Sequence, residues 1–189
     1  MPSSDFAPRI AWQGHSWRLR VQSVQLTDGS SIEKGTIDHP GSVVLIPLRE
    51  TERGHEVVML HQFRLALGKY ILELPAGTRD WQEDWLSCAQ RELREETGYR
   101  ATNLQPLGRC WPAPGLSNEL MAVYLATGLQ SDPLPQDSDE IIELRLLPLQ
   151  ELIEMALDGR LHDAKSVVGI LRTAYYLQNS SSTQNLFPG

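Results

Sequence analysis

The chain has 189 residues, of which 41% are hydrophobic and 22% are charged. These values are close to globular averages, and the length suffices for one domain with a full hydrophobic core. The formal net charge of −7 argues against nonspecific binding to nucleic acid or to anionic membranes, because such binding depends mainly on positive charge. We therefore expect a globular protein with no nucleic-acid and no membrane partner.

The cysteines and the amino-terminal residues indicate the cellular compartment. Cys88 and Cys110 form no CxxC pair, which argues against a zinc site and favours a reducing compartment, with one disulfide as an open alternative. The amino-terminal residues lack the apolar segment of a signal peptide, and apolar runs such as 43–46 are too short to span a bilayer. We expect a soluble, cytoplasmic protein.

Residues 1–40 predict an antiparallel strand pair ahead of the main domain. Alternating β-forming residues indicate strands at 17–26 and 31–37, and Asp28 with Gly29 is typical of the turn between them. Two strands have little core of their own, so we expect this extension to pack on another surface.

Residues 41–179 predict a domain that combines strands and helices, followed by a polar tail, 180–189, that we expect to be disordered. Runs of β-forming residues predict strands at 42–47, 57–62, 70–74, 102–109, 120–127 and 141–147. Helical periodicity predicts helices at 84–97, 149–157 and 163–177.

The first of these helices has an apolar stripe and a cluster of acids. Leu86, Ala89 and Leu93 recur at helical spacing, and Gly98 is a typical helix terminator. Glu92, Glu95 and Glu96 fall within an arc of roughly 100° beside that stripe. Their mutual repulsion opposes the helix by roughly 0.2–0.5 kcal/mol per pair, so an opposing charge is expected.

Two interpretations of these acids are open from their positions alone. Oxygen ligands on a rigid element suit a hard cation such as Mg²⁺ or Mn²⁺. A solvated acidic face paired with Arg91 and Arg94 is the commoner arrangement, and the glutamates by themselves favour it.

The spacing around the helix reverses that preference. Residues 77–99 read G-x5-E-x7-R-E-L-x-E-E-x-G-Y, which resembles the signature of the Nudix hydrolases, the Nudix box. Its seven fixed positions are occupied by Gly77, Glu83, Arg91, Glu92, Glu95, Glu96 and Gly98, while Tyr99 stands where an aliphatic residue is usual. At average residue frequencies, such a match has a chance on the order of 10⁻⁸ per window.

The resemblance implies a Nudix fold, an α/β (α+β) arrangement with a mixed β-sheet sandwiched between helices. It implies that Glu92, Glu95 and Glu96, with the carbonyl of Ala76, bind two or more Mg²⁺ or Mn²⁺ ions, and that Glu95 and Glu96 take part in catalysis. Gly77, Glu83, Arg91 and Gly98 are implied to hold the loop–helix–loop in shape. The ions would neutralise a diphosphate and polarise its phosphorus.

A wider resemblance covers residues 17–177. The runs VVLIPL, VVMLHQFRLALGKYILELPAG and PAPGLSNE are similar to the ADP-ribose pyrophosphatase and nucleotide-sugar branch of the family. Pro114 lies 15 residues beyond Tyr99, close to a marker proline of that branch. The implied reaction splits ADP-ribose or a related nucleotide sugar into a nucleoside monophosphate and a sugar phosphate; GDP-mannose hydrolases share HQFR and ELPAG.

Four residues are candidates for substrate binding. Arg64, at a strand end, suits a phosphate because its guanidinium donates two parallel hydrogen bonds. Glu73 is placed to bind a ribose hydroxyl or a metal-bound water, and Pro114 and Glu119 belong to a rigid loop suited to shaping a pocket. The alternatives are an ordinary surface arginine, a strand-end charge and simple turn chemistry.

The general base and the assembly rest on the same resemblance. In that branch the base lies on an acidic loop before the last strand, which points to Glu140 here, then Asp139, with a box glutamate or a merely solvated loop as alternatives. The extension crosses to a second subunit in that branch, so we expect a homodimer whose sites are shared. Trp17, Tyr70, Trp111 and Tyr124 are open candidates for stacking on the base.

Two other functions compete with this one. One is another Nudix activity, on oxidised nucleoside triphosphates or dinucleoside polyphosphates, against which the PAPGLSNE loop and the extension argue. The other is a non-catalytic ligand sensor with a DNA-binding domain. The intact box glutamates argue against it, as does the shortness of the segment after Pro148.

Overall fold

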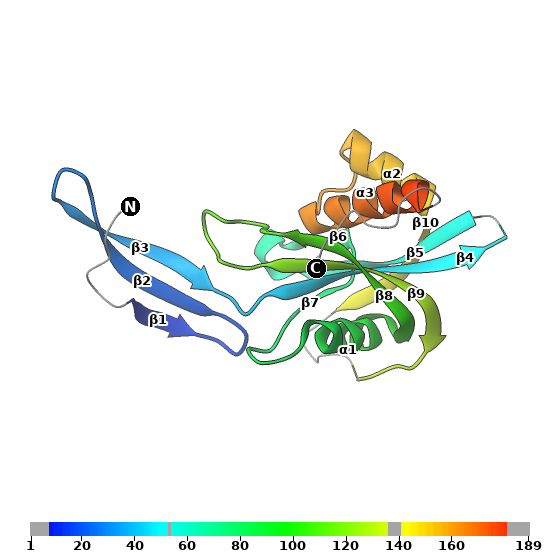
Figure 1. Ribbon diagram of the computed structural model, residues 1–189, viewed down its shortest axis with the longest axis horizontal. Coiled ribbons are helices and arrows are strands. Elements are labelled where there is room, and N and C mark those ends of the chain that lie inside the picture. Colours follow the sequence, from blue (N-terminus) through cyan, green and yellow to red (C-terminus); the bar gives the residue numbers. More distant parts are fainter. Residues whose placement is uncertain (1–7, 53, 136–140, 181–189) are drawn as a thin grey trace.

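The computed structural model describes residues 8–52, 54–135 and 141–180, which form two β-sheets and three α-helices (Figure 1). The small sheet contains β1 (Arg9–Gln13), β2 (Arg18–Gln25) and β3 (Ser31–Asp38). The large sheet contains β4 (Ser42–Thr51), β5 (Gly54–Arg64), β6 (Lys69–Glu73), β7 (Ala76–Thr78), β8 (Tyr99–Cys110), β9 (Met121–Ser131) and β10 (Ile142–Pro148). The helices are α1 (Trp85–Thr97), α2 (Leu149–Asp158) and α3 (Ala164–Asn179), and a short 3₁₀ turn, Leu65–Leu67, joins β5 to β6.

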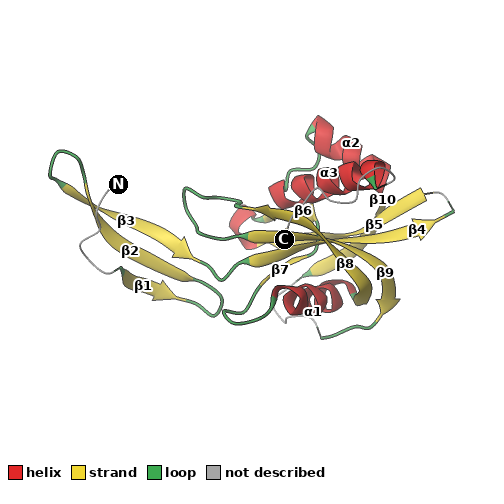
Figure 2. Cartoon of the chain, viewed as in Figure 1, coloured by secondary structure: helices red, strands yellow, loops and turns green. Residues whose placement is uncertain are grey.

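The large sheet is mixed and lies between helices. Its strand order is β10-β5-β4-β9-β8, with β6 paired to β5 and β7 paired to β4. The β4–β9 pair is parallel and the other pairs are antiparallel. Helix α1 covers one face, whereas α2 and α3 cover the other (Figure 2). This confirms the mixed sheet sandwiched between helices.

Strand β4 shows why the sheet needs both helical layers. Val43 and Leu45 belong to the core on the α1 side, while Val44 and Ile46 belong to the core on the α2–α3 side. Successive side chains of a strand point to opposite faces, so a continuous apolar run is stable only where both faces are covered. The run VVLI is fully buried for this reason.

Helix α1 begins and ends where its capping residues predict. The carboxylate of Asp84 accepts hydrogen bonds from the backbone N–H groups of the second and third helical residues, both at 3.0 Å. Gly98 ends the helix with φ of 74°, a left-handed conformation that glycine adopts without strain. The predicted helix at 84–97 is confirmed.

The apolar stripe predicted on this helix is wrong at one position. Ala89 and Leu93 are fully buried, as expected, and Cys88 is buried beside them. Leu86 is 50% exposed instead. In the first turn of the helix it is Trp85 that packs against the core, so Leu86 remains on the solvent side.

The extension is a three-stranded antiparallel sheet rather than the predicted strand pair. Strands β2 and β3 pair as expected, and β1 adds to the free edge of β2. Figure 1 shows this sheet beside the main body, joined to β4 by the short junction after Asp38. Strand β1 escaped prediction because its five residues, RIAWQ, are too few to show a clear alternation.

The other predicted elements match with shifted ends. Strand β8 begins three residues before the predicted 102–109, and β7 was not predicted because a strand of three residues has no periodicity. Residues 181–189, most of the expected disordered tail, lie outside the described residues. Among the helices described, none has the length and apolar character needed to cross a membrane.

Candidate active site

The box begins with a strand that pairs directly with the central strand of the sheet. In β7, Ala76 and Gly77 pair with Val44 and Val43 of β4. A Cβ atom on Gly77 would lie 1.7 Å from the carboxyl carbon of Glu92. The glycine therefore lets the helix carboxylate approach the backbone of β7.

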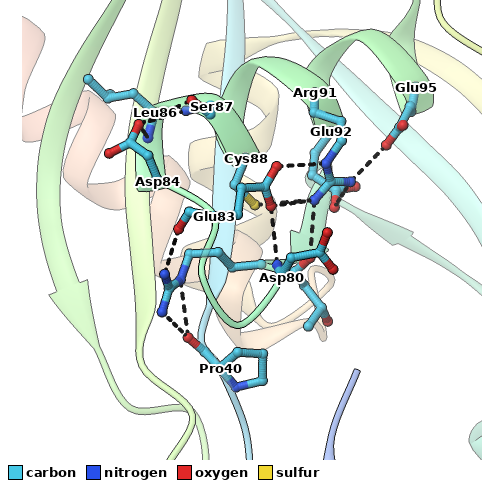
Figure 3. Close-up of polar contacts among 12 residues, drawn as sticks. Pro40, Asp80, Glu83, Asp84, Leu86, Ser87, Cys88, Arg91, Glu92 and Glu95 are labelled. Atoms are coloured by element: carbon cyan, nitrogen blue, oxygen red, sulfur yellow. Dashed lines mark hydrogen bonds and ion pairs between the residues drawn. The ribbon is translucent and has the colours of Figure 1, made fainter. Parts of the chain in front are cut away.

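The guanidinium of Arg91 binds three carboxylates of the box, those of Glu83, Glu92 and Glu95 (Figure 3). It donates to Glu83 at 2.9 Å from Nε and 2.8 Å from Nη2. Its Nη1 donates to Glu92 at 2.7 Å and to Glu95 at 2.9 Å. The hydrogen bonds from Arg91 hold the pKa of Glu83 below its ordinary value, and the same contacts raise the pKa of the guanidinium. The carboxylate of Glu83 is thus held in its ionised form beside Arg91.

Glu96 joins the helix to β7 from inside the protein. Its side chain is 2% exposed, and Oε2 accepts a hydrogen bond of 2.8 Å from the backbone N–H of Ala76. Ala76, whose carbonyl is expected to bind a metal, is therefore held through its N–H by Glu96, an expected metal ligand. A buried carboxylate accepting a backbone N–H fixes the separation of the two elements.

The box opens into a cleft of about 630 Å³. Its walls are lined from the extension, the box, β5, the loop before β9 and the start of α3, by His15, Ser16, Ser42, Arg64, Ala76, Gly77, Thr78, Asp80, Arg91, Glu92, Glu95, Pro112, Glu119, Met121, Asp163, Ala164 and Lys165. This volume suits a ligand larger than a single phosphate. The lining mixes carboxylates on the box side with cations from β5 and α3, as an anionic ligand with bound cations requires.

Two of the predicted substrate-binding residues are paired with each other. Arg64 donates to Glu73 from Nε at 2.8 Å and from Nη2 at 2.9 Å. Lys165, at the start of α3, also donates to Glu73 and to Asp163, the latter at 3.0 Å. Arg64 lines the cleft, whereas Glu73 is 1% exposed and lies behind it.

The predicted loop residues separate into two places. Glu119 lines the cleft and accepts a hydrogen bond of 2.6 Å from the hydroxyl of Ser42. Pro114 instead lines a second hollow, of about 470 Å³, together with Trp111 and residues of β2 and β3. The structure thus places Pro114 beside the extension rather than beside the box.

Sequence reasoning missed three charged residues of the cleft, Asp80, Asp163 and Lys165. Asp163 caps α3 by accepting from the backbone N–H of Ser166 at 3.0 Å, and the sequence does carry this helix-start signal. Nothing local shows that Lys165 reaches Glu73, 92 residues earlier in the chain. Glu140 and Asp139, the candidates for the general base, lie outside the described residues.

The donor set of the box fits a hard divalent cation. Glu92, Glu95, Glu96 and the carbonyl of Ala76 offer only oxygen, the ligand type that Mg²⁺ and Mn²⁺ prefer. Across residues 8–52, 54–135 and 141–180, no three acidic, histidine or cysteine side chains converge as a ready metal site. Arg91 donates from Nη1 to one carboxylate oxygen of Glu92 and to one of Glu95, and a carboxylate can accept such a bond and bind a cation at the same time.

Comparison with known proteins decides the family. The NUDIX domain matches residues 38–168 of this chain. The chain belongs to the Nudix hydrolase family. Its resemblance to the Nudix box is thereby confirmed, and it is a hydrolase of the Nudix pyrophosphatase type. Nudix hydrolases generally use divalent metal ions, in keeping with the oxygen donors of the box.

Similar proteins extend the likeness beyond the Nudix domain. The methanol dehydrogenase activator of Bacillus methanolicus is 32% identical over 161 residues, 84% of this chain and 85% of that protein. The ADP-ribose pyrophosphatase of Bacillus subtilis is 32% identical over 168 residues, 88% of this chain and 87% of that protein. A crystal structure of an ADP compounds hydrolase shares the Nudix fold, with a TM-score of 0.79 and 18% identity over 96% of this chain and 97% of that one.

Proposed function

We propose that this Nudix enzyme hydrolyses the diphosphate linkage of ADP-ribose or a related nucleoside diphosphate sugar. The products would be a nucleoside monophosphate and a sugar phosphate, AMP and ribose 5-phosphate from ADP-ribose. The observation that carries the proposal is the cleft itself, in which Glu92 and Glu95 lie in the same cavity as Arg64 and Lys165. The similarity to an ADP-ribose pyrophosphatase over 88% of the chain supports this substrate class.

The proposed roles follow from the chemistry of the lining residues. Glu92, Glu95, Glu96 and the carbonyl of Ala76 would hold two or more Mg²⁺ or Mn²⁺ ions, which neutralise the diphosphate and polarise its phosphorus. Arg91 with Glu83, and Gly77 with Gly98, keep the loop–helix–loop in shape.

Three further residues would bind the ligand or shape its pocket. Arg64 lines the cleft and would contact a phosphate, with Glu73 fixing the plane of its guanidinium. Glu119, oriented by Ser42, would accept a hydrogen bond from a ligand hydroxyl. Pro114 would shape the second hollow, where the nucleoside end of the ligand would lie. Glu140 stays the predicted general base, with Glu95, Glu96 and Asp139 as the alternatives.

A substrate panel tests the reaction. We expect purified full-length protein with Mg²⁺ to release nucleoside monophosphate from ADP-ribose, ADP-glucose or GDP-mannose, and not to prefer NADH or a nucleoside triphosphate. Cleavage of the triphosphate alone would contradict the substrate class while leaving the family assignment in place. Repeating the panel with Mn²⁺ compares the two metals directly.

A single-residue variant tests the metal-binding role. Glu96→Gln keeps the shape of the side chain and an oxygen that can accept from Ala76, but it removes the charge that a cation needs. We expect activity to fall by about 10²–10³-fold with unchanged circular dichroism. Glu151→Gln on α2 is the matched control, because that glutamate is exposed and far along the chain from the box. Equal activity of both variants would contradict the role.

The homodimer is proposed on the character of the extension, taken as residues 1–40 ahead of a Nudix domain at 41–179. Large apolar side chains of the extension remain exposed: Ile10 by 45%, Trp12 by 49%, Trp17 by 37%, Leu26 by 40% and Ile32 by 36%. Such a surface favours association with a second copy. We expect light scattering to give twice the chain mass, and Ile10→Glu with Ile32→Glu to give the single mass; a wild-type monomer would contradict the dimer.

A further inference from the structure

The junction between the extension and the Nudix domain, His39–Gly41, is held by the box loop, residues 79–84 between β7 and α1. The guanidinium of Arg79 donates to the carbonyl of Pro40 from Nε at 3.1 Å and from Nη2 at 2.7 Å. The backbone N–H of Arg79 also donates to the carbonyl of Gly41 at 3.0 Å. Figure 3 shows Pro40 beside the loop that carries Asp80 and Glu83. The junction is therefore fixed by three hydrogen bonds from one box-loop residue.

The same guanidinium fixes the end of the box loop. Its Nη1 donates to the backbone carbonyl of Glu83 at 2.6 Å, and its centre lies 4.5 Å from the ring centre of Trp85. Glu83 in turn accepts from Arg91 through its carboxylate. Arg79 thus contacts the junction on one side and the residue that orients Arg91 on the other.

Close packing makes this contact intolerant of displacement. Gly41 has φ of 102°, and a Cβ atom there would lie 2.5 Å from the ring of Trp85. A second contact joins the extension to the box loop. The guanidinium of Arg18 in β2 lies 4.0 Å from the ring centre of Trp81 in that loop. The box loop therefore contacts the N-terminal part of the chain at two points, one at the junction and one at β2.

Past the junction, the chain continues into β4, which pairs with β7 next to the proposed metal ligands. Ser42 pairs with Thr78, and the next two residues of β4 pair with Gly77 and Ala76. A shift of the junction would therefore move β7, on which the carbonyl of Ala76 and the approach of Glu92 depend. Strand pairing transmits such a shift because its hydrogen bonds fix register.

We propose that Arg79 is a positioning residue that couples the seating of the N-terminal sheet to divalent-cation binding by the box. This rests on the proposed metal-binding role of the box. Arginine suits the task because its planar fork donates to two carbonyls in fixed directions, which a lysine ammonium does not reproduce. Whatever holds the extension in place, a second copy of the chain included, would thereby tighten the cation site.

Two readouts on the full-length protein test the coupling. One is the Mn²⁺ dissociation constant, from the paramagnetic resonance signal of free Mn²⁺. The other is hydrogen exchange of the backbone amides at residues 36–42, with and without saturating Mn²⁺. In the wild type we expect Mn²⁺ to slow exchange at 36–42. In Arg79→Leu we expect this slowing to vanish and the dissociation constant to rise about tenfold, as for outer-shell partners of metal sites.

Arg172→Leu is the matched control. Arg172 is also an arginine that donates to two backbone carbonyls, those of Leu107 at 3.2 Å and Arg109 at 3.3 Å, but it does so from α3 on the other side of the sheet. We expect this variant to bind Mn²⁺ as the wild type does. Arg79→Lys serves if Arg79→Leu fails to fold, with a smaller rise in the dissociation constant.

The outcomes separate the coupling from the proposed function. Slowing of exchange at 36–42 that persists in Arg79→Leu, or that is missing in a wild type that binds Mn²⁺, would overturn the coupling and leave the proposed function standing. A wild type that binds no Mn²⁺ would overturn the metal-binding role and the coupling with it. Equal weakening in Arg79→Leu and Arg172→Leu would show a general loss of stability and would also overturn the coupling.

Discussion

Glu73 is 1% exposed and accepts two parallel hydrogen bonds from Arg64, at 2.8 and 2.9 Å. Lys165 donates to the same carboxylate from the start of α3. The carboxylate is thus surrounded by cations that compensate for its burial. This arrangement gives Glu73 a structural contribution alongside the ligand contact proposed for Arg64.

Replacing Glu73 with glutamine should destabilise the fold. The amide keeps the shape but leaves Arg64 and Lys165 without their shared counter-charge. We expect a loss of about 2–3 kcal/mol, below the 3–5 kcal/mol of a fully buried pair because Arg64 retains 38% exposure. Urea unfolding measures the loss. Glu143→Gln, in the exposed pair with Arg145 at 2.8 Å, should cost under about 1 kcal/mol, and equal losses would refute the argument.

Replacing Gly77 with alanine should damage the site more than the fold. The new methyl group would lie 1.7 Å from the carboxyl carbon of Glu92, so this flexible side chain has to move. We expect activity or metal affinity to fall about 10–100-fold, as when other supporting contacts of metal sites are removed. Gly35→Ala in β3 is the control, since its Cβ meets only Leu19 at 3.7 Å. Normal activity in Gly77→Ala would show that Glu92 does not need its present position.

The short-range part of this structure is visible in the sequence. The spacing of Glu83, Arg91, Glu92 and Glu95 already predicts their common location, because a helix and its preceding loop place them within reach of one another. The capping residue Asp84 and the terminator Gly98 likewise define α1 locally. Such contacts depend on residues few positions apart, which periodicity resolves.

The long-range part is not visible in the same way. Lys165 meets Glu73 only because α3 packs across the sheet, and Arg79 meets Pro40 only because β7 pairs with the start of β4. Neither contact leaves a periodic pattern in the chain. Leu86 fits the helical period and is nonetheless exposed, because the core contact in its turn belongs to a neighbour. Tertiary packing, rather than local pattern, decides these positions.

The ion pair of Glu83 with Arg91 should make stability depend on pH. Hydrogen bonding from Arg91 lowers the pKa of Glu83 in the folded state below its unfolded value of roughly 4.3. The pair therefore stabilises the fold fully above that value, and the contribution is lost as the pH falls through the folded pKa. We expect the free energy of unfolding to fall less steeply in Glu83→Gln than in the wild type below about pH 4.3. Parallel curves would contradict the assignment.

The two thiols should differ sharply in reactivity. Cys88 is fully buried on α1, and burial, followed by the charge of Glu83, raises the pKa of its thiol. Because the thiolate is the reactive form, Cys88 should stay unmodified in the folded protein. Cys110, at the end of β8, is only partly buried and is open to reagent. We expect a disulfide reagent at pH 8 to modify one thiol per folded chain and two per unfolded chain. Cys110→Ser should abolish the reaction of the folded protein; continued modification would show that the helix opens to expose Cys88.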